Sequence, residues 1–165
     1  MLSSNNEYLV NYLSDNNHND GIMPIKAPGG LGITSVVFPN TLRIIGNYAF
    51  RGNSITKIKF PSSLLAIGDE AFYNNPITGE LDLTNTKVET IGYNAFIGSK
   101  ITSVKLPNTI VSIGNSAFYN WNYEDECNYL TNIYLGNANA ELGSCVFGEV
   151  DSIEHNLPDS YLCES

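Results

Sequence analysis

The hydrophobic pattern of the chain repeats as one short unit. The unit is clearest in residues 101–118 (ITSVKLPNTIVSIGNSAF), and it recurs at 33–50, 55–72, 77–96 and, in a worn form, 130–147. Each copy ends in an apolar residue, a glycine, two variable residues, a small residue and a phenylalanine. The glycines, at positions 46, 68, 92, 114 and 143, are 22, 24, 22 and 29 residues apart by subtraction. This period is typical of a leucine-rich-repeat solenoid, in which each unit buries its apolar face against its neighbours.

The first part of each unit alternates apolar and polar residues, the pattern of a strand with one buried face. Pairs such as Val104 and Leu106 are therefore expected to point into the core. Pro39, Pro61 and Pro107 follow directly and stop the strands, because proline cannot donate to a sheet ladder. The pattern predicts five coils around one parallel sheet, with strands centred near Val37, Lys59, Asp82, Lys105 and Tyr134.

The second part of each unit predicts a short helical turn. The glycine supplies either a positive φ or a close approach between coils. Asn47, Asp69 and Asn115 stand where a helix N-cap would be, whereas Tyr93 breaks this pattern. The small alanine lets adjacent coils stack, and the phenylalanine fills the space between them, so Phe96 is expected to be fully enclosed.

The unit resembles the BspA-type (Treponema pallidum-type) leucine-rich repeat, whose hallmark is a strand, Leu-Pro and then IGxxAF. The resemblance covers roughly residues 31–147. It implies an α/β repeat solenoid, a right-handed leucine-rich-repeat coil with one parallel β-sheet on the concave face and short helical turns on the convex face. It also implies bacterial surface adhesion or protein binding. The family usually has cysteine three residues after the phenylalanine, where this chain has Asn53, Asn75, Ser99 and Trp121. Asn or Ser can bond to backbone in the same turn, so we expect the fold to survive.

The expected organisation is an N-terminal cap and lead-in (1–30), five repeats (31–147) and a C-terminal cap (148–165). Residues 7–13 have helical spacing and could pack on the first coil, and residues 150–162 echo the strand and Leu-Pro pattern. The sequence has neither a signal peptide nor a membrane-spanning stretch. The chain therefore either acts inside the cell or is an excised domain of a longer secreted or cell-surface protein, and the resemblance favours the second.

The composition and the absence of catalytic motifs exclude several classes of function. A net charge of −9 disfavours nucleic acid and anionic membrane surfaces as partners. His18 and His155 have no partner at metal-ligand spacing, and no phosphate-binding or nucleophile motif is present. We therefore expect that the chain is not an enzyme and that it binds neither a cofactor nor a metal ion. Of the three cysteines, Cys145 is expected to be a free thiol, and Cys127 could bridge to Cys163.

Two regions are candidate binding sites. The first is an insertion at 119–129 that the other copies lack, with Tyr119, Trp121 and Tyr123. It is either a surface loop whose aromatics lie on the repeats or a ligand-contact loop. Its acidic residues, 124–126, favour a solvated charge run over a calcium site.

The second candidate is the exposed face of the sheet, where side chains are expected to align in two ladders: Ser35, Lys57, Glu80, Ser103 and Asn132, and Val37, Lys59, Asp82, Lys105 and Tyr134. Glu80 and Asp82 are expected to lie beside Lys57 and Lys59, and Asp82 is also expected to face Lys105. These charge pairs either fix strand register or form a docking site. Two functions follow from the sequence: a module that binds a protein or glycan, or a structural spacer in a longer repeat protein.

Overall fold

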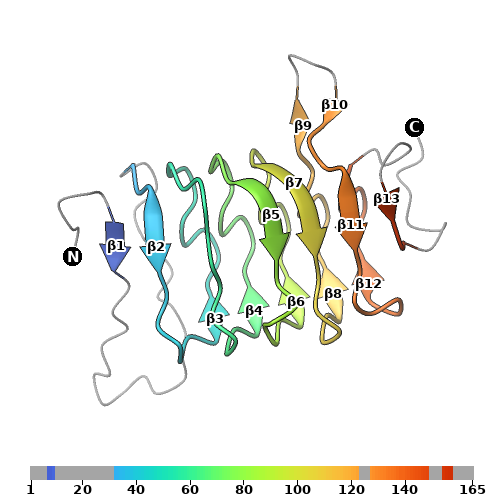
Figure 1. Cartoon of the computed structure of the whole chain (residues 1–165), viewed down its shortest axis with the longest axis horizontal. Coiled ribbons are helices and arrows are strands. Elements are labelled where there is room, and N and C mark those ends of the chain that lie inside the picture. The colour runs from blue at the N-terminus through green and yellow to red at the C-terminus, as the bar shows by residue number, and fades with distance from the viewer. Residues whose placement is uncertain (1–6, 10–31, 123–126, 149–153, 158–165) are drawn as a thin grey trace.

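The structure is a computed structural model of the chain, and it describes residues 7–9, 32–122, 127–148 and 154–157 (Figure 1). For residues 7–9, 121–122 and 127–128 it describes the backbone alone. The described residues form an elongated coil whose turns stack along its long axis, with the N-terminal strand at one end and the last strand at the other.

The coil is built from short β-strands. Their bounds are β1 (Glu7–Leu9), β2 (Ser35–Val37), β3 (Ile44–Ile45), β4 (Ala66–Ile67), β5 (Thr78–Asp82), β6 (Thr90–Ile91), β7 (Lys100–Lys105), β8 (Ser112–Ile113), β9 (Trp121–Asn122), β10 (Cys127–Asn128), β11 (Asn132–Tyr134), β12 (Glu141–Leu142) and β13 (Glu154–His155).

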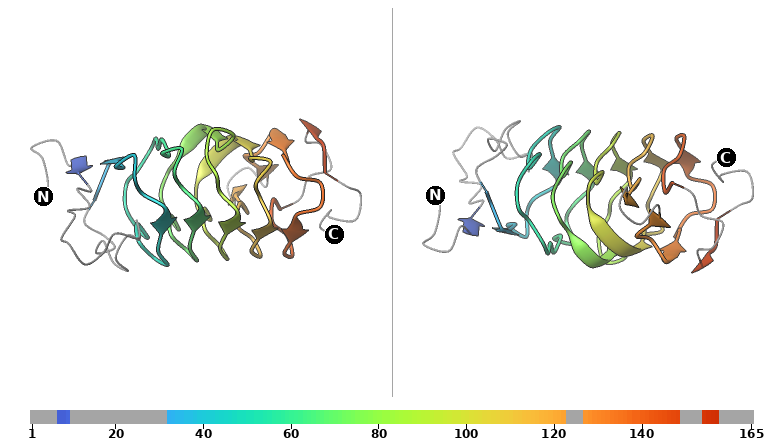
Figure 2. Two further views of the ribbon diagram at one scale, coloured as in Figure 1. Left: turned by 90° about the horizontal axis from the view of Figure 1, so that it is seen from below. Right: turned by 90° about the horizontal axis from the view of Figure 1, so that it is seen from above.

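Two parallel sheets run along opposite sides of the coil (Figure 2). One has the strand order β13-β11-β7-β5, and the other has the order β12-β8-β6-β4-β3. The second sheet takes one strand from each of the five copies, formed by the two residues before the repeat glycine. The sequence predicted one sheet, and the second is a correction. When coils stack in register, any extended segment lies beside its counterpart in the next coil and can pair with it.

The predicted strands are confirmed in three copies, where β5, β7 and β11 pair in parallel. In the first copy, β2 pairs with β1. The prediction of a strand around Lys59 is wrong, because no strand is formed there. The Thr56 carbonyl still accepts a hydrogen bond from the Thr78 amide at 3.0 Å, so this segment lies beside β5 without a full ladder.

A stack of phenylalanine rings forms the centre of the core. The rings of Phe50, Phe72, Phe96, Phe118 and Phe147 lie nearly parallel, with centroids 5.2–5.7 Å apart from one coil to the next. Phe96 is completely buried, as predicted. The repeat alanines, such as Ala95, are also completely buried, so each coil packs closely on the next.

The predicted helical turns are not formed, since no helix occurs among the described residues. Instead, the second residue after each repeat glycine has a positive φ: Tyr48, Glu70, Asn94, Ser116 and Cys145. This left-handed residue turns its amide away from its own coil, and the Tyr48 amide donates to the Asp69 carbonyl at 2.8 Å. The turns therefore bond between coils, where a helix would bond within one segment.

The repeat glycines serve the close approach between coils, the second of the two roles predicted for them. They are not among the positive-φ residues. A Cβ at Gly92 would lie 2.4 Å from the Asp69 amide nitrogen, and a Cβ at Gly114 would lie 2.5 Å from that of Tyr93. A side chain at these positions would force the coils apart.

The predicted N-cap residues bond to the neighbouring coil. Their side-chain oxygens each accept a hydrogen bond from the next coil's backbone: Asn47 from Asp69 at 2.8 Å, Asp69 from Tyr93 at 2.8 Å, and Asn115 from Ser144 at 2.9 Å. This row of bonds is interrupted at Tyr93, whose side chain has no oxygen in the corresponding place. The interruption that the sequence indicated is real, but it affects coil stacking rather than a helix.

Polar residues after the phenylalanine bond to backbone inside the coil, as predicted for Asn. Asn75 is completely buried, and its amide donates to the Phe50 and Phe72 carbonyls at 2.7 and 3.1 Å while accepting from the Ile55 amide at 3.2 Å. Asn53 makes similar bonds to Ile33 and Phe50 in the first copy. Each such residue satisfies backbone groups that would otherwise be buried without a partner.

The two ends of the five-copy coil differ from the sequence-based expectations. Residues 7–9 form a strand rather than the predicted helix, and residues 10–13 lie outside the described residues. At the other end, β13 pairs with β11, so the segment that echoes the repeat extends the sheet.

The cysteines differ from their predicted states. Cys145 is disulfide-bonded, so its prediction as a free thiol is wrong. The chain has three cysteines, so Cys145 is bonded to one of the other two, and the predicted bridge from Cys127 to Cys163 is wrong as well.

Candidate functional site

The exposed face of the four-stranded sheet carries the two predicted ladders in three copies. Glu80 lies opposite Ser103, which in turn lies opposite Asn132. Asp82 lies opposite Lys105, which in turn lies opposite Tyr134. Lys57 and Lys59 are exposed but lie outside any strand. The structure therefore aligns the central and C-terminal members of both ladders on one surface, which we call the outer sheet face.

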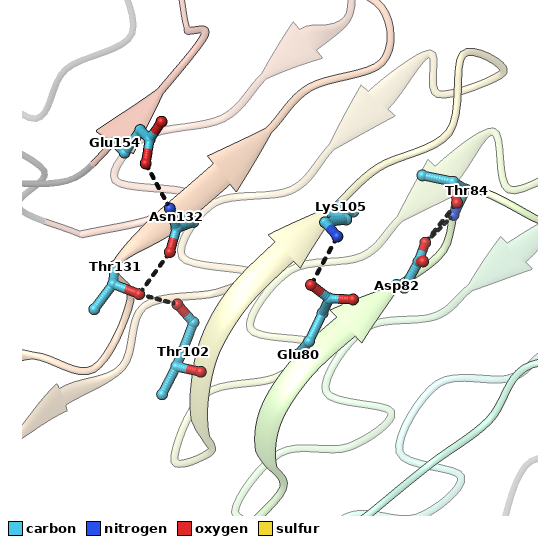
Figure 3. Close-up of polar contacts among 8 residues, drawn as sticks. All are labelled: Glu80, Asp82, Thr84, Thr102, Lys105, Thr131, Asn132 and Glu154. Carbon is cyan, nitrogen blue, oxygen red and sulfur yellow. Dashed lines mark hydrogen bonds and ion pairs between the residues drawn. The ribbon is translucent and has the colours of Figure 1, made fainter.

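The charged pairing on this face differs from the predicted one (Figure 3). Lys105 Nζ lies 2.8 Å from Glu80 Oε2, diagonally across the β5–β7 pair, although Asp82 stands directly opposite Lys105. The hydrogen bond from Lys105 to Glu80 raises the pKa of the lysine. Within the described residues, neither Lys57 nor Lys59 forms an ion pair with Glu80 or Asp82.

Asp82 bonds within its own chain segment instead. Its Oδ1 accepts from the Thr84 hydroxyl at 2.6 Å and from the Thr84 backbone amide at 2.9 Å (Figure 3). These two hydrogen bonds lower the pKa of Asp82, in that order of size, with a smaller contribution from Lys105. Asp82 therefore bonds to Thr84 in the turn after β5 and not to Lys105 on the neighbouring strand, because the backbone holds the donors of the turn in place.

Polar groups continue the outer sheet face towards β13. The Thr131 hydroxyl lies 2.9 Å from the Thr102 carbonyl and 2.8 Å from Asn132 Oδ1, and the Asn132 amide donates to Glu154 at 3.0 Å (Figure 3). Beside this strip, the ring of Tyr134 is 49% exposed. The face therefore combines a polar, hydrogen-bonding surface with one exposed aromatic side chain.

The insertion at 119–129 forms a hairpin in which β9 and β10 pair antiparallel. The hairpin projects beyond the stacked coils next to β7 and β11 (Figure 1). Tyr119, at its base, is half-buried. The side chain of Trp121 and the whole of Tyr123 lie outside what the structure describes, so their proposed contact role stays a prediction.

In most copies a buried polar residue lies three positions after the repeat phenylalanine, but just before the hairpin it lies only two positions after it. In the third copy, this position is Ser99, three residues after its phenylalanine, and the Ser99 hydroxyl donates to Asn120 Oδ1 at 2.9 Å. Asn120 comes only two residues after Phe118 and is buried, which places Trp121 outside the repeat pattern. The sequence signalled the insertion through its length and through Trp121, but it did not reveal that Asn120 takes over the buried role.

A groove on the opposite, five-stranded sheet was not anticipated from the sequence. It has a volume of about 780 Å³ and crosses all five strands, between Ile44 and Gly143. Tyr93 lines it, and the break that this residue makes in the Asn/Asp pattern was the available signal.

Among the described residues, no group of three or more His, Cys, Asp or Glu side chains is placed so that it could hold a metal ion. In that same part of the chain, no helix has the length and apolar character needed to cross a membrane.

Comparison with known families agrees with the fold. The model of the BspA type leucine rich repeat region matches residues 29–154 in six copies, one more than the five copies identified from the sequence pattern. No curated protein matches the chain. The extent of the family match, well over half of the chain, includes both the outer sheet face and the hairpin.

Proposed function

This chain belongs to the family of proteins with BspA-type leucine-rich repeats, and from that premise we propose that it is a non-catalytic binding module. Repeats of this type commonly mediate protein binding or adhesion. In the proposed role, the outer sheet face and the hairpin hold a protein partner, and the chain serves as an adhesion or surface-recognition domain of a bacterial protein. It would stand at the cell surface or be secreted as part of a longer protein.

The observation that carries the proposal is the combination of charges and an aromatic ring on one rigid face. Lys105 and Glu80 are each about half exposed and paired, and Tyr134 stands in register beside Lys105. Exposed ion pairs contribute only about 0–1 kcal/mol to stability, so stability alone gives weak reason for this arrangement. Tyrosine is enriched among the residues that dominate binding energy at protein interfaces, where charged residues at the rim fix orientation.

The experiment measures binding of the purified chain to a panel of immobilised extracellular-matrix proteins by surface plasmon resonance. Tyr134→Ala and Asp82→Lys are compared with Glu141→Gln, which lies on the opposite sheet. Loss of binding in the first two variants, with unchanged unfolding free energies, supports docking on the outer sheet face. A ligand bound equally well by all three variants would contradict the proposed surface.

The hairpin is tested through Trp121, the only tryptophan in the chain. Red-shifted emission that is readily quenched, together with weaker partner binding by Trp121→Ala, would support a contact role. Blue emission that resists quenching, with lower stability and unchanged binding in that variant, would make the hairpin a structural brace.

The continuous phenylalanine stack favours a second candidate function, that of a structural spacer. Rings spaced evenly from Phe50 to Phe147 make the coil a rod with no break between coils. If an unrelated rod of equal length replaces the repeats in a longer natural protein and restores its activity, the spacer role is supported. If adhesion is lost with this replacement and also with Tyr134→Ala, the binding role is supported.

A further inference from the structure

We propose that the groove on the five-stranded sheet binds a linear, uncharged polysaccharide, with the ring of Tyr93 as the platform for one sugar. The five-stranded sheet that lines this groove lies on the side of the coil away from the four-stranded sheet (Figure 2), so the proposal is independent of the protein-binding role. Its floor is the outward face of β3, β4, β6, β8 and β12, and one wall is the row of residues that follow the repeat glycines.

Tyr93 is the exception in that wall. At the equivalent position in other copies, Asn47, Asp69 and Asn115 each hold the next coil by a hydrogen bond to its backbone amide. Tyr93 cannot make this bond, so its coil lacks this hydrogen bond to the next coil. Tyr93 is 48% exposed and is one of the residues that line the groove. Departures from a local structural rule concentrate at functional sites, and here the departure places a flat aromatic surface in a groove.

The groups around Tyr93 determine the class of ligand. Asp69 and Asn115 flank it on the wall, and the hydroxyls of Thr90 and Ser112 stand on the floor. Amides, carboxylates and hydroxyls are hydrogen-bonding partners for sugar hydroxyls, and an aromatic face packs against the C–H face of a pyranose ring. The groove lining contains no Lys, Arg or His, and it includes Asp69 and Glu141. An anionic polymer would therefore meet uncompensated negative charge.

The geometry of the groove favours a linear chain over a single sugar. Ala66, Thr90 and Ser112 are in register across three strands, and parallel strands lie about 4.8 Å apart. A polymer along the coil axis would cross one strand after another, with hydroxyls on two neighbouring strands at Thr90 and Ser112. Affinity is therefore expected to rise with the number of sugar residues until the groove is filled.

An extended peptide fits the groove less well. A peptide strand gains its backbone hydrogen bonds at a sheet edge, but this groove lies on the face of a sheet whose strands already pair with each other. A basic peptide attracted by Asp69 and Glu141 remains the competing ligand, and the experiment includes it.

The experiment uses isothermal titration calorimetry of the full chain against uncharged linear oligosaccharides of different linkage, each as a disaccharide and a hexasaccharide. Hexalysine and an oligogalacturonate are the charged probes. Tyr93→Asn restores the residue type of the other copies, so it should fold with undiminished thermal stability. Tyr93→Phe keeps the ring. Tyr134→Ala removes a similarly exposed tyrosine from the other side of the coil and is the matched control.

We expect at least one uncharged hexasaccharide to bind more tightly than its disaccharide. Its dissociation constant should rise about tenfold in Tyr93→Asn, corresponding to the loss of one aromatic contact. It should be nearly unchanged in Tyr93→Phe and in Tyr134→Ala. The proposal is overturned if no uncharged oligosaccharide binds at millimolar concentration, if hexalysine alone binds, or if Tyr93→Asn binds as tightly as the natural chain. None of these results would bear on protein binding by the outer sheet face.

Discussion

Replacing Phe96 by alanine tests the packing of the solenoid most directly. The Phe96 ring is completely buried, stacks on Phe72 at 5.3 Å and on Phe118 at 5.2 Å, and meets Phe60 edge-on at 6.5 Å. Truncation of a buried phenylalanine to alanine costs about 3–5 kcal/mol through lost burial and the cavity left behind. With three ring contacts removed at once, we expect a value at the upper end of this range.

The matched comparison is Phe147→Ala in the last copy. Phe147 lies in the last of the five copies, is 3% exposed and stacks on Phe118 at 5.7 Å. Its truncation should cost about 1–2 kcal/mol less than that of Phe96, because the end of the stack can relax around the cavity more easily than its middle.

Urea unfolding followed by circular dichroism measures both variants, and thermal unfolding should show a decrease of roughly 6–20 °C for Phe96→Ala. A cost below about 1 kcal/mol for Phe96→Ala would refute the stacking argument, since such a value is typical of a surface substitution. An equal or larger cost for Phe147→Ala would show that the stack is not the centre of the core.

Three further predictions concern polar groups and the disulfide. Asn75→Ala should lower the unfolding free energy by about 2–4 kcal/mol, because it removes the side-chain partner of the Phe72 carbonyl and the Ile55 amide and one of the two side-chain donors to the Phe50 carbonyl; in urea unfolding the exposed Asn85→Ala should be nearly neutral, and equal effects would contradict the buried role. Thr84→Val should raise the pKa of Asp82, measured by carboxyl-carbon NMR, because the hydroxyl bond that lowers this pKa is removed. Since the folded-state pKa of Asp82 is lowered, its stabilising contribution is present above its unfolded-state pKa and is lost as the pH falls through the folded-state value; an unshifted titration in Thr84→Val would contradict the assignment. Thiol titration of the oxidised chain should find one free thiol, because Cys145 takes part in a disulfide and the chain has three cysteines; three reactive thiols in the native protein would refute that bond.

Much of the fold could be predicted because every copy of the repeat has a similar spacing of apolar residues. The alternating pattern correctly indicated buried residues such as Val104 and Leu106, and the final phenylalanine correctly indicated the core. The outer sheet face was predictable in register from Glu80 to Asn132 for the same reason. The partner of Lys105 was not, since Glu80 and Asp82 lie two residues apart on one strand and both are within reach of a long, flexible side chain.

The sequence by itself determined the period of the coil, the side chains that face inward and the position of the insertion. These depend on the spacing of apolar residues along one segment, which is a local property of the chain. Tertiary structure alone decided that the residues after each glycine form left-handed turns rather than helical ones, that the two residues before each glycine join a second sheet, and that Asn47, Asp69 and Asn115 bond across coils. Each of these choices is settled by donors and acceptors about 22–29 residues away, which come within 3 Å only when whole coils stack in register. A four-residue turn carries too little local preference to choose between conformations, so the neighbouring coil makes the choice by supplying its hydrogen-bond partners.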